Sequence, residues 1–309
     1  MNKWGLVVDL TNLFIRKSRV LAAFEHLLRV RTPDKEFWTW EVYALGAALR
    51  RVLNLRWNTR LRAGSDHGIN LGTEPGDSDK KLNTDIHVTW SLWRAKMEFP
   101  DARLVLRAQH PWVPYRKSKG YKLLPQARGT IVFVPHTVPG LDYEEFNIED
   151  FLATLKSLPE KFQPLTLCLQ FHDASIEAVV KIAKAGYRSV TAGNSLSLAY
   201  ADRFYSLIRE HEYATSPSIG SQLFYCHELG LKYFLFDPGK KFQRKLKPTN
   251  GVPSPNLELV KRIEGAFDFA SMGSRLRERN TIVEDGLGLD LDASQNFGYG
   301  PLLKSIKGK

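Results

Sequence analysis

Residues 212–236 read EYATSPSIGSQLFYCHELGLKYFLF, and this stretch decides the fold. It starts with a short strand at 213–215 and continues through the loop SPSIGS at 216–221. A helix at 222–229 and the strand KYFLF at 232–236 complete it. Gly230, directly after the last helical residue, is typical of a helix end. This order predicts a βαβ unit with parallel strands and a right-handed crossover.

The same alternation continues upstream. Strand-like apolar runs lie at 129–135, 165–171 and 187–193, and segments with helical spacing of apolar residues lie at 147–158, 175–184 and 201–210. Ser175 suits the N-cap of the second helix, and Gly186 follows its end. The pattern predicts a Rossmann-like domain at 126–250, built on a parallel sheet with helices on both faces.

The first half of the chain is less regular. We expect helices at 11–30 and 39–56 and strands near 61–66, 86–90 and 103–108, which together predict a second α/β lobe at 1–125. The proline-containing, basic segment 110–129 is expected to connect the lobes. Residues 251–309 are expected to form a wrapping tail with one amphipathic helix at about 257–279. The predicted fold class is therefore α/β with two Rossmann-like lobes.

The charge is concentrated in the first lobe. The 309 residues carry a formal charge of +11; residues 1–125 hold 22 Lys+Arg against 12 Asp+Glu, and the rest hold 22 against 21. All seven tryptophans lie between Trp4 and Trp112. Basic residues mixed with tryptophan attract an anionic lipid leaflet, a charged polysaccharide or a nucleic acid, although a solvated basic face is an equal alternative. Nucleic acid is the weakest option, because no zinc-finger, KH or RNP signature is present.

Several classes of protein are excluded. No apolar run approaches the roughly 18 residues of a membrane span, and the N-terminus lacks the features of a signal peptide. Cys168 and Cys226 form no motif for a disulfide framework or a zinc site. We expect a cytoplasmic protein, with peripheral contact to the inner membrane as an option.

Polar residues follow several strands of the predicted sheet. The serine loop 216–221 leads into a helix, where free backbone N–H groups favour a phosphate, although a plain N-cap is the alternative. His136 could donate to a phosphate or protonate a leaving oxygen, or it could be a turn residue. The residues expected to bind the nucleotide are Thr137, His172, Gly193, Asn194, Ser216, Ser218, Gly220 and Ser221.

A second polar loop, Ser65-Asp66-His67-Gly68, follows a candidate strand of the first lobe. It supplies a carboxylate and an imidazole for a general base, although Asp and Gly are also ordinary turn residues. Gly68, His110 and Arg116 are expected to line the acceptor side of the cleft. His87 and His227 lie in apolar contexts and are expected in the core or on a helix.

Other catalytic motifs are missing from the sequence. It has no G-x-S-x-G, P-loop, G-x-G-x-x-G or H-E-x-x-H pattern. The acidic stretch 284–292 lacks EF-hand spacing. Asp77-Ser78-Asp79 is the one D-x-D pattern, and its Gly/Pro/Ser-rich surroundings make it a weak manganese site. We therefore expect no metal and no cofactor.

The run from Gly129 to Phe236 resembles the C-terminal, nucleotide-sugar-binding lobe of GT-B-fold glycosyltransferases. The order SDHG, PHT and SPSIGS is similar to three motifs of bacterial sialyltransferases and related capsule polysaccharide enzymes. The resemblance implies that Asp66 is the base that deprotonates the acceptor, that His136 is the motif histidine and that the serines bind phosphate. His67 stands where the family has a second acidic residue, and Thr137 where it has proline.

The resulting hypothesis is a glycosyltransferase, inverting in mechanism, that moves a sugar from a nucleotide donor to a glycan or lipid-linked glycan in surface polysaccharide synthesis. CMP is one candidate nucleotide. Asp66 would be the base, or His67 if Asp66 only orients it. The alternative hypothesis is a non-catalytic basic protein that binds an anionic membrane, a glycan or RNA.

Overall fold

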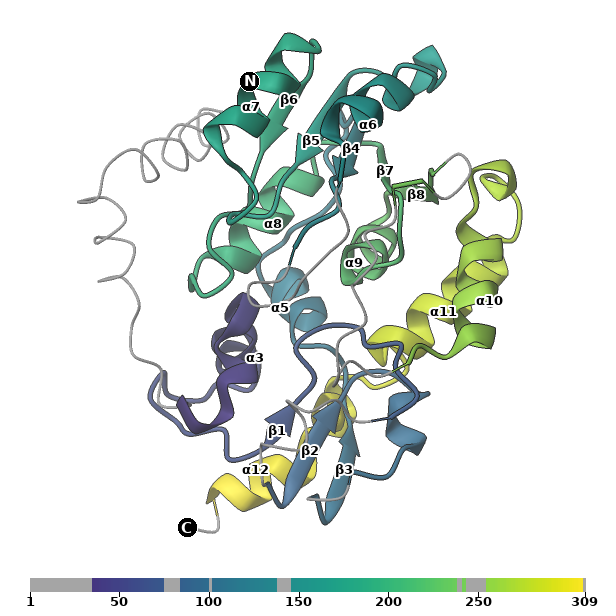
Figure 1. Cartoon of the computed structure of the whole chain (residues 1–309). Coiled ribbons are helices and arrows are strands. Elements are labelled where there is room, and N and C mark those ends of the chain that lie inside the picture. Colours follow the sequence, from purple (N-terminus) through teal and green to yellow (C-terminus); the bar gives the residue numbers. More distant parts are fainter. Residues whose placement is uncertain are drawn as a thin grey trace, which may run out of the picture.

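The structure is a computed structural model, which describes residues 35–74, 84–99, 102–137, 146–237, 241–242 and 254–307. The expected helix at 11–30 and the Asp77-Ser78-Asp79 motif lie outside the described residues. Two separate parallel sheets organise the described part, one of three strands and one of five (Figure 1). The class is therefore α/β, as predicted.

The five-stranded sheet has the order β6-β5-β4-β7-β8, and all its neighbouring strands pair in parallel. The predicted strands are confirmed with shorter bounds: β4 (Thr130–Phe133), β5 (Leu165–Cys168), β6 (Arg188–Val190), β7 (Tyr213–Ser216) and β8 (Lys232–Leu235). The chain builds outward from β4 to β6 and then returns to the other side of β4 with β7. The direction of winding thus reverses between β4 and β7, which in open parallel sheets is where ligands bind.

Helices cover both faces of this sheet. Alternate strand residues point to opposite faces, so Ile131 and Phe133 enter one buried cluster and Val132 and Val134 enter another. The second cluster contains apolar residues of α6 (Ile148–Leu155) and α7 (Ile176–Lys184). The first contains those of α8 (Tyr200–Ile208) and α9 (Ser221–Leu229).

The helix boundaries follow the expected signals. The Ser175 side chain accepts a hydrogen bond from the Ala178 N–H and caps α7, and Asn147 caps α6 in the same way. Gly230 ends α9 with φ of 108°, a conformation that costs other residues free energy. The predicted caps are confirmed.

The three strands expected in the first lobe are present and form one parallel sheet. It consists of β1 (Gly64–Ser65), β2 (Ile86–Thr89) and β3 (Leu104–Arg107), paired in parallel in that order. The strand expected at 61–66 thus shortens to two residues. Within the described residues this sheet has three strands, against five in the other sheet.

The helix predicted over 39–56 is wrong in its first half. The chain instead forms η1 (Lys35–Trp40), η2 (Val42–Ala44) and α3 (Leu45–Val52). Tyr43 and Ala44 both have φ of 57°, which interrupts a right-handed helix. The Trp40 indole donates to the Ala63 carbonyl at 2.8 Å, so the bend packs the start of this segment against the approach to β1.

Segment 110–129 is more than a connection, because it contains the helix α5 (Trp112–Ser118). Trp112 is buried, and its ring contacts Phe204 and Tyr225 on α8 and α9. Two short 3-10 helices, η3 (Arg94–Lys96) and η4 (Glu160–Phe162), complete the loops before β3 and β5.

The C-terminal segment holds several helices instead of the single predicted one. They are α10 (Leu257–Phe267), η5 (Phe269–Ser271), α11 (Leu276–Leu287), η6 (Ala293–Gly298) and α12 (Gly300–Lys307). Asp268 has an extended ψ of 145° and caps η5, which ends α10. Buried Arg279 donates to the Ala266 and Tyr233 carbonyls and so fixes α11 beside β8.

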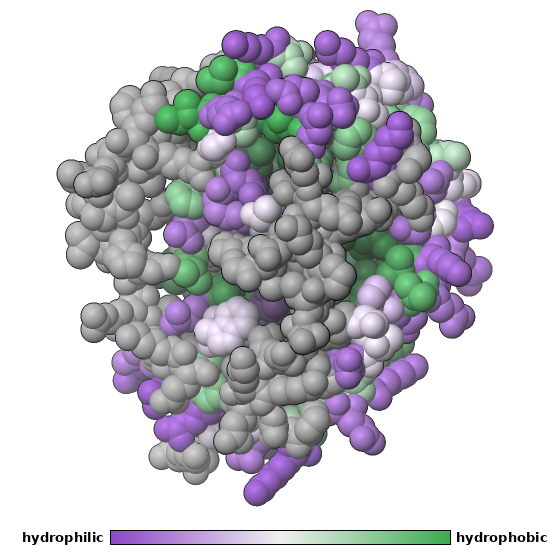
Figure 2. Space-filling view, viewed as in Figure 1, coloured by the Kyte–Doolittle hydropathy of each residue, from purple (hydrophilic) through white to green (hydrophobic). Residues whose placement is uncertain are grey.

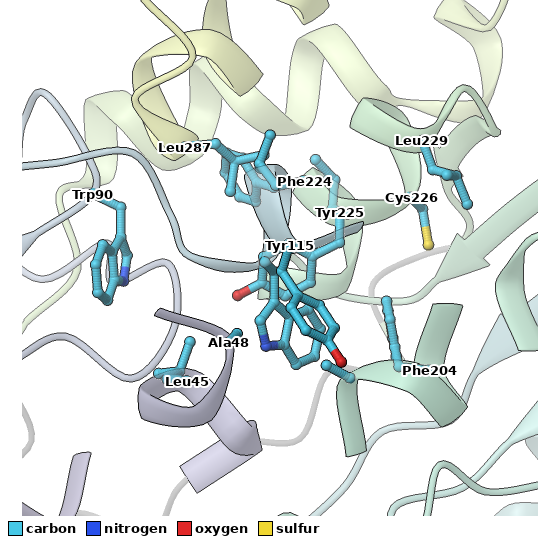
Figure 3. Packing of buried hydrophobic residues seen from close by; sticks show 14 of the residues in the cluster. Leu45, Ala48, Trp90, Tyr115, Phe204, Phe224, Tyr225, Cys226, Leu229 and Leu287 are labelled. Carbon is cyan, nitrogen blue, oxygen red and sulfur yellow. The ribbon is translucent and has the colours of Figure 1, made fainter. Parts of the chain in front are cut away.

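One continuous buried cluster joins the two sheets. Figure 3 shows Leu45 of α3, Trp90 after β2, Phe204 of α8, Phe224 of α9 and Leu287 of α11 converging on it. Backbone bonds add to this connection, because the N–H groups of Leu92 and His110 donate to the Asp285 and Leu287 carbonyls. No helix in the described part of the chain is long and apolar enough to cross a membrane.

Candidate functional site

The loops that leave β4 and β7 form the candidate site. Val132 of β4 pairs with Thr215 of β7, so the His136 turn and the serine loop leave the sheet side by side at its carboxyl edge. This is the point where the strand order reverses. Two of the predicted motifs therefore meet at the position where the topology favours a ligand.

Ser216 contributes to the shape of the serine loop. Its side chain is buried, its hydroxyl donates to the Ser218 carbonyl, and it accepts a hydrogen bond from the Tyr233 hydroxyl at 2.7 Å. The expectation that the Ser216 hydroxyl binds phosphate does not fit these contacts. Ser216 holds the turn that leads into α9.

The N-terminus of α9 is the polar feature that the loop presents. Gly220 is the N-cap residue, with an extended backbone, and no side chain caps the helix. Ser218, Gly220 and Ser221 are half-buried. Because the first N–H groups of a helix have no partner within the helix and carry the positive end of its dipole, this terminus suits an anion.

The loop after β1 reaches this helix terminus from the other sheet. The backbone N–H of Ile69 donates to Ser221 Oγ at 2.8 Å, across 152 residues of sequence. A Cβ atom at Gly68 would lie 2.7 Å from the same oxygen, so the close approach depends on glycine at that position. The structure thus joins the predicted SDHG and SPSIGS motifs.

His67 is the exposed ionisable residue of that loop. Its ring lies 5.4 Å from the ring of Trp38, which is itself 39% exposed. The imidazole is therefore presented at the surface one residue before the Gly68 contact with α9. An exposed imidazole in this position can accept a proton from a bound molecule.

Asp66 lies on the opposite, buried side of the loop. Its carboxylate accepts from Thr89 Oγ1 at 2.6 Å and from Arg94 Nη2 at 3.1 Å, and His87 Nε2 lies 3.3 Å away. Burial alone would raise the pKa of Asp66, but Arg94, His87 and Thr89 together hold the pKa well below its ordinary value. The expectation that Asp66 takes the acceptor proton does not fit this geometry, since a buried, ion-paired carboxylate of low pKa is a poor base.

A second polar cluster lies at the ends of β4 and β5. Asp173 accepts from the Thr137 N–H at 2.9 Å and from Thr137 Oγ1 at 2.7 Å. His172 Nε2 lies 2.6 Å from the Thr137 carbonyl oxygen, and His136 Nδ1 lies 2.8 Å from it. The structure therefore brings three predicted residues together with Asp173.

Gly193 and Asn194, after β6, form a turn. Gly193 has φ of 84°, and the Asn194 side chain accepts from the Leu196 N–H at 2.9 Å. The Ser195 carbonyl accepts from the Tyr43 N–H, which links this turn to η2. The two residues thus shape the edge of the sheet.

Two residues expected on the acceptor side are structural. His110 is fully buried; its Nδ1 accepts from the Trp112 N–H, and its Nε2 lies 3.0 Å from the Tyr225 hydroxyl. Arg116 forms a bidentate ion pair with Glu228, which ties α5 to α9. The expected cleft role does not fit these contacts, because His110 is buried and the Arg116 guanidinium is paired with Glu228.

Sequence reasoning missed Arg94, and it placed Asp173 at the end of a strand beside His172 without including it among the site residues. Arg94 is completely buried, a rare environment for arginine, but nothing in its local pattern marks it as the partner of Asp66. Asp173 could have been found from register, since Phe133 pairs with Cys168 and the polar residues follow three to five positions later on both strands. His87 is buried as expected, and His227 lies half-buried on α9.

Basic residues of α3, within the N-terminal 125 residues, line a pocket of about 930 Å³ between α3, α5 and α8. Arg51 and Trp57 line this pocket, and Trp57 is 68% exposed.

The surface of the molecule is mixed in character. Figure 2 shows hydrophilic residues along much of the outline of one face of the molecule, with smaller hydrophobic patches between them.

Comparisons with known proteins identify no family. No family model and no curated protein matches the chain. Among solved structures, the wall teichoic acid polymerase TagF is similar with a TM-score of 0.45 and 13% identity, over 81% of this chain and 69% of that one. Its H444N and H548A variants give TM-scores of 0.44 with 12% and 14% identity, over 81% and 82% of this chain and 69% of each. Likeness at this level carries no inference about function, so the proposals below rest on the residues of the chain.

Proposed function

We propose that the protein is a glycosyltransferase that takes a sugar from a nucleotide donor at the sheet edge where the loops after β4 and β7 leave. The observation that carries the proposal is the Ile69 to Ser221 hydrogen bond, because it joins the loop of an exposed imidazole to an uncapped helix N-terminus. The motif resemblance to GT-B enzymes supports the same reading. The two halves of such a site are an acceptor-activating base and a phosphate-binding helix.

The donor half is the N-terminus of α9. We propose that its backbone N–H groups, with Ser218 and Ser221 beside them, bind the nucleotide phosphate and stabilise the charge that develops on it during transfer. His136 and Thr137 follow β4 at the same edge of the sheet, and His136 is the candidate proton donor to the leaving phosphate. CMP remains a candidate nucleotide because of the sialyltransferase-like motif order.

The acceptor half is the loop at 65–69. We propose that His67 removes the proton from the acceptor hydroxyl while its oxygen attacks the anomeric carbon. The bond from that carbon to the donor phosphate oxygen breaks, and the nucleotide leaves with the bonding electron pair. Asp66 is a positioning residue in this scheme, since its bonds to Arg94 and Thr89 fix the loop.

The acceptor is proposed to be an anionic glycan or a lipid-linked glycan, with peripheral membrane contact in the cytoplasm. The net positive charge of the first 125 residues supports it, as do Arg51 and Trp57 at the pocket near α3. Binding that depends on these residues must weaken between low and high salt. Equal binding at both salt concentrations would contradict this part.

The same exposed Trp57 also favours the second candidate function, a non-catalytic protein that binds an anionic surface. Tryptophan and arginine together suit a lipid interface or a glycan without any chemistry. The two functions differ in one respect that can be measured. Only the transferase requires a nucleotide at α9.

The test is a thermal-shift screen with CMP, UDP, GDP, dTDP and their sugar conjugates. A ligand at 100 times its dissociation constant stabilises a protein by about 2.7 kcal/mol. We expect one nucleotide class to stabilise the protein by about this amount. Gln222→Glu adds an anion in the first turn of α9, and we expect it to weaken the binding of that nucleotide at least tenfold.

The matched control is Gln126→Glu, an identical charge change on an exposed residue shortly before β4, at the opposite edge of the sheet. It should leave nucleotide binding unchanged. The proposal fails if no nucleotide shifts the folded protein, or if both variants weaken binding equally.

A further inference from the structure

Three metal-ligating side chains meet at the ends of β4 and β5, outside the base and the helix terminus described above. They are His136, His172 and Asp173, and one nitrogen or oxygen atom of each lies within 4.8 Å of the others. Both histidines are exposed and Asp173 is half-buried, so the cluster is open to solvent. The strands β4 and β5 are direct neighbours, which fixes the spacing of the two loops (Figure 1).

Thr137 orients the carboxylate of this cluster. Its N–H and its hydroxyl donate to different oxygens of Asp173, at 2.9 and 2.7 Å. A carboxylate that accepts hydrogen bonds at both oxygens from one residue has little freedom to rotate. Hydrogen bonds of this kind from a neighbouring residue orient ligands in protein metal sites.

The two imidazoles converge on one point. His136 Nδ1 and His172 Nε2 lie 2.8 and 2.6 Å from the same oxygen, the Thr137 carbonyl, and His172 Nε2 lies 3.4 Å from Asp173 Oδ2. In these contacts the Thr137 carbonyl oxygen is the hydrogen-bond acceptor for both rings. An ion bound by the three side chains would replace that oxygen as the partner of the two nitrogens.

We infer that His136, His172 and Asp173 bind a divalent transition-metal ion of the Zn²⁺ class. Two imidazoles and one carboxylate suit zinc and its neighbours, whereas Mg²⁺ and Ca²⁺ prefer oxygen ligands alone. Three protein ligands leave at least one position of the ion open. The inference replaces the expectation from the sequence that no metal is needed, and it does not depend on the proposed sugar transfer.

The test is calorimetric titration of Zn²⁺ into the full-length, chelator-treated protein without any nucleotide, with Mg²⁺ as the comparison ion. We expect one saturable Zn²⁺ site and at least tenfold weaker binding of Mg²⁺. Co²⁺ in place of Zn²⁺ should give visible absorption bands of a protein-bound ion with nitrogen ligands.

Four variants locate the ion. His172→Gln and Asp173→Asn should weaken Zn²⁺ binding at least tenfold, and Thr137→Val should weaken it by about tenfold through the lost bond to Asp173. His227→Gln is the control, because His227 lies on α9 with Asn280 as its partner, and it should bind Zn²⁺ like the wild type. Thermal unfolding of each variant without metal establishes that it is folded.

The inference is overturned by the absence of saturable Zn²⁺ binding, or by affinity that is equal in the wild type and in the His172 and Asp173 variants. Zn²⁺ binding through His136 would leave that side chain unavailable as the proton donor to the leaving phosphate. Nucleotide binding and the role of His67 as the base are measured separately. A failure of the metal-site inference can therefore be distinguished from a failure of the proposed sugar transfer.

Discussion

Each of the two sheets has a polar loop with an aspartate beside a histidine, and the two aspartates differ in burial. After β1, Asp66 turns inward and pairs with Arg94 in a buried network. After β5, Asp173 lies at a solvent-facing edge among two exposed histidines. An aspartate beside a histidine after a strand thus lies in two different environments, and the buried Arg94 guanidinium accounts for the difference.

The largest effect that separates the two loops concerns stability. Asp66→Asn leaves the buried guanidinium of Arg94 without its counter-charge, which typically costs about 3–5 kcal/mol of unfolding free energy. Asp173→Asn removes a charge that water still reaches, and we expect a loss below about 1 kcal/mol. Urea unfolding of both variants measures the difference. Equal losses would mean that the two carboxylates are not distinguished by burial.

The second effect is a pH dependence that arises in the core beside β3. Burial lowers the pKa of His110 to about 3, although the charge of Asp66 opposes the shift. In the unfolded chain His110 has an ordinary pKa near 6.5, so between pH 6.5 and 3 the unfolded state binds more protons. Stability must therefore fall as the pH drops through this window, by up to about 1.4 kcal/mol per pH unit.

The measurement is the unfolding free energy between pH 7.5 and 5 for the wild type, His110→Gln and the exposed-site control His67→Gln. We expect a shallower pH slope in His110→Gln alone. A wild-type slope in that variant, or an equal change in the control, would contradict a buried neutral His110.

The smallest effect concerns the contact between the two regions. Ser221→Ala removes the acceptor for the Ile69 N–H, which should cost about 0.5–1.5 kcal/mol of unfolding free energy. Ser218→Ala, in the same loop, is the control and should cost less. Hydrogen exchange at Ile69 should also become faster in Ser221→Ala. Unchanged exchange would show that the bond does not hold the loop after β1 against α9.

Much of the five-stranded sheet could be predicted from its sequence. The β-branched runs, the Ser175 cap and the Gly230 helix end are local signals, and parallel strands follow from their alternation with helices. The structure of residues 39–56 could not be predicted, because it depends on contacts with residues distant in the sequence. Nothing local to residues 39–56 shows that Tyr43 and Ala44 adopt positive φ.

The sequence predicts which loops leave the five-stranded sheet at the same edge, but it does not predict their contacts. The strand register brings the ends of β4, β5 and β7 to that edge. The burial of Asp66 and His110 depends on Arg94 and Tyr225, whose positions no sequence spacing reveals. The His136, His172 and Asp173 cluster joins residues up to 37 positions apart in the sequence and forms only when β4 and β5 pair.

The most direct test of the central claim is the rate of sugar transfer, with the nucleotide donor class that binds, in the wild type, His67→Gln and the control His227→Gln. We predict transfer by the wild type and the control, and a loss of at least about 10²-fold in His67→Gln with unchanged nucleotide binding and thermal stability. Equal rates in all three proteins would contradict His67 as the base. A folded wild type that binds a nucleotide sugar but transfers nothing to any glycan acceptor would contradict the proposed function.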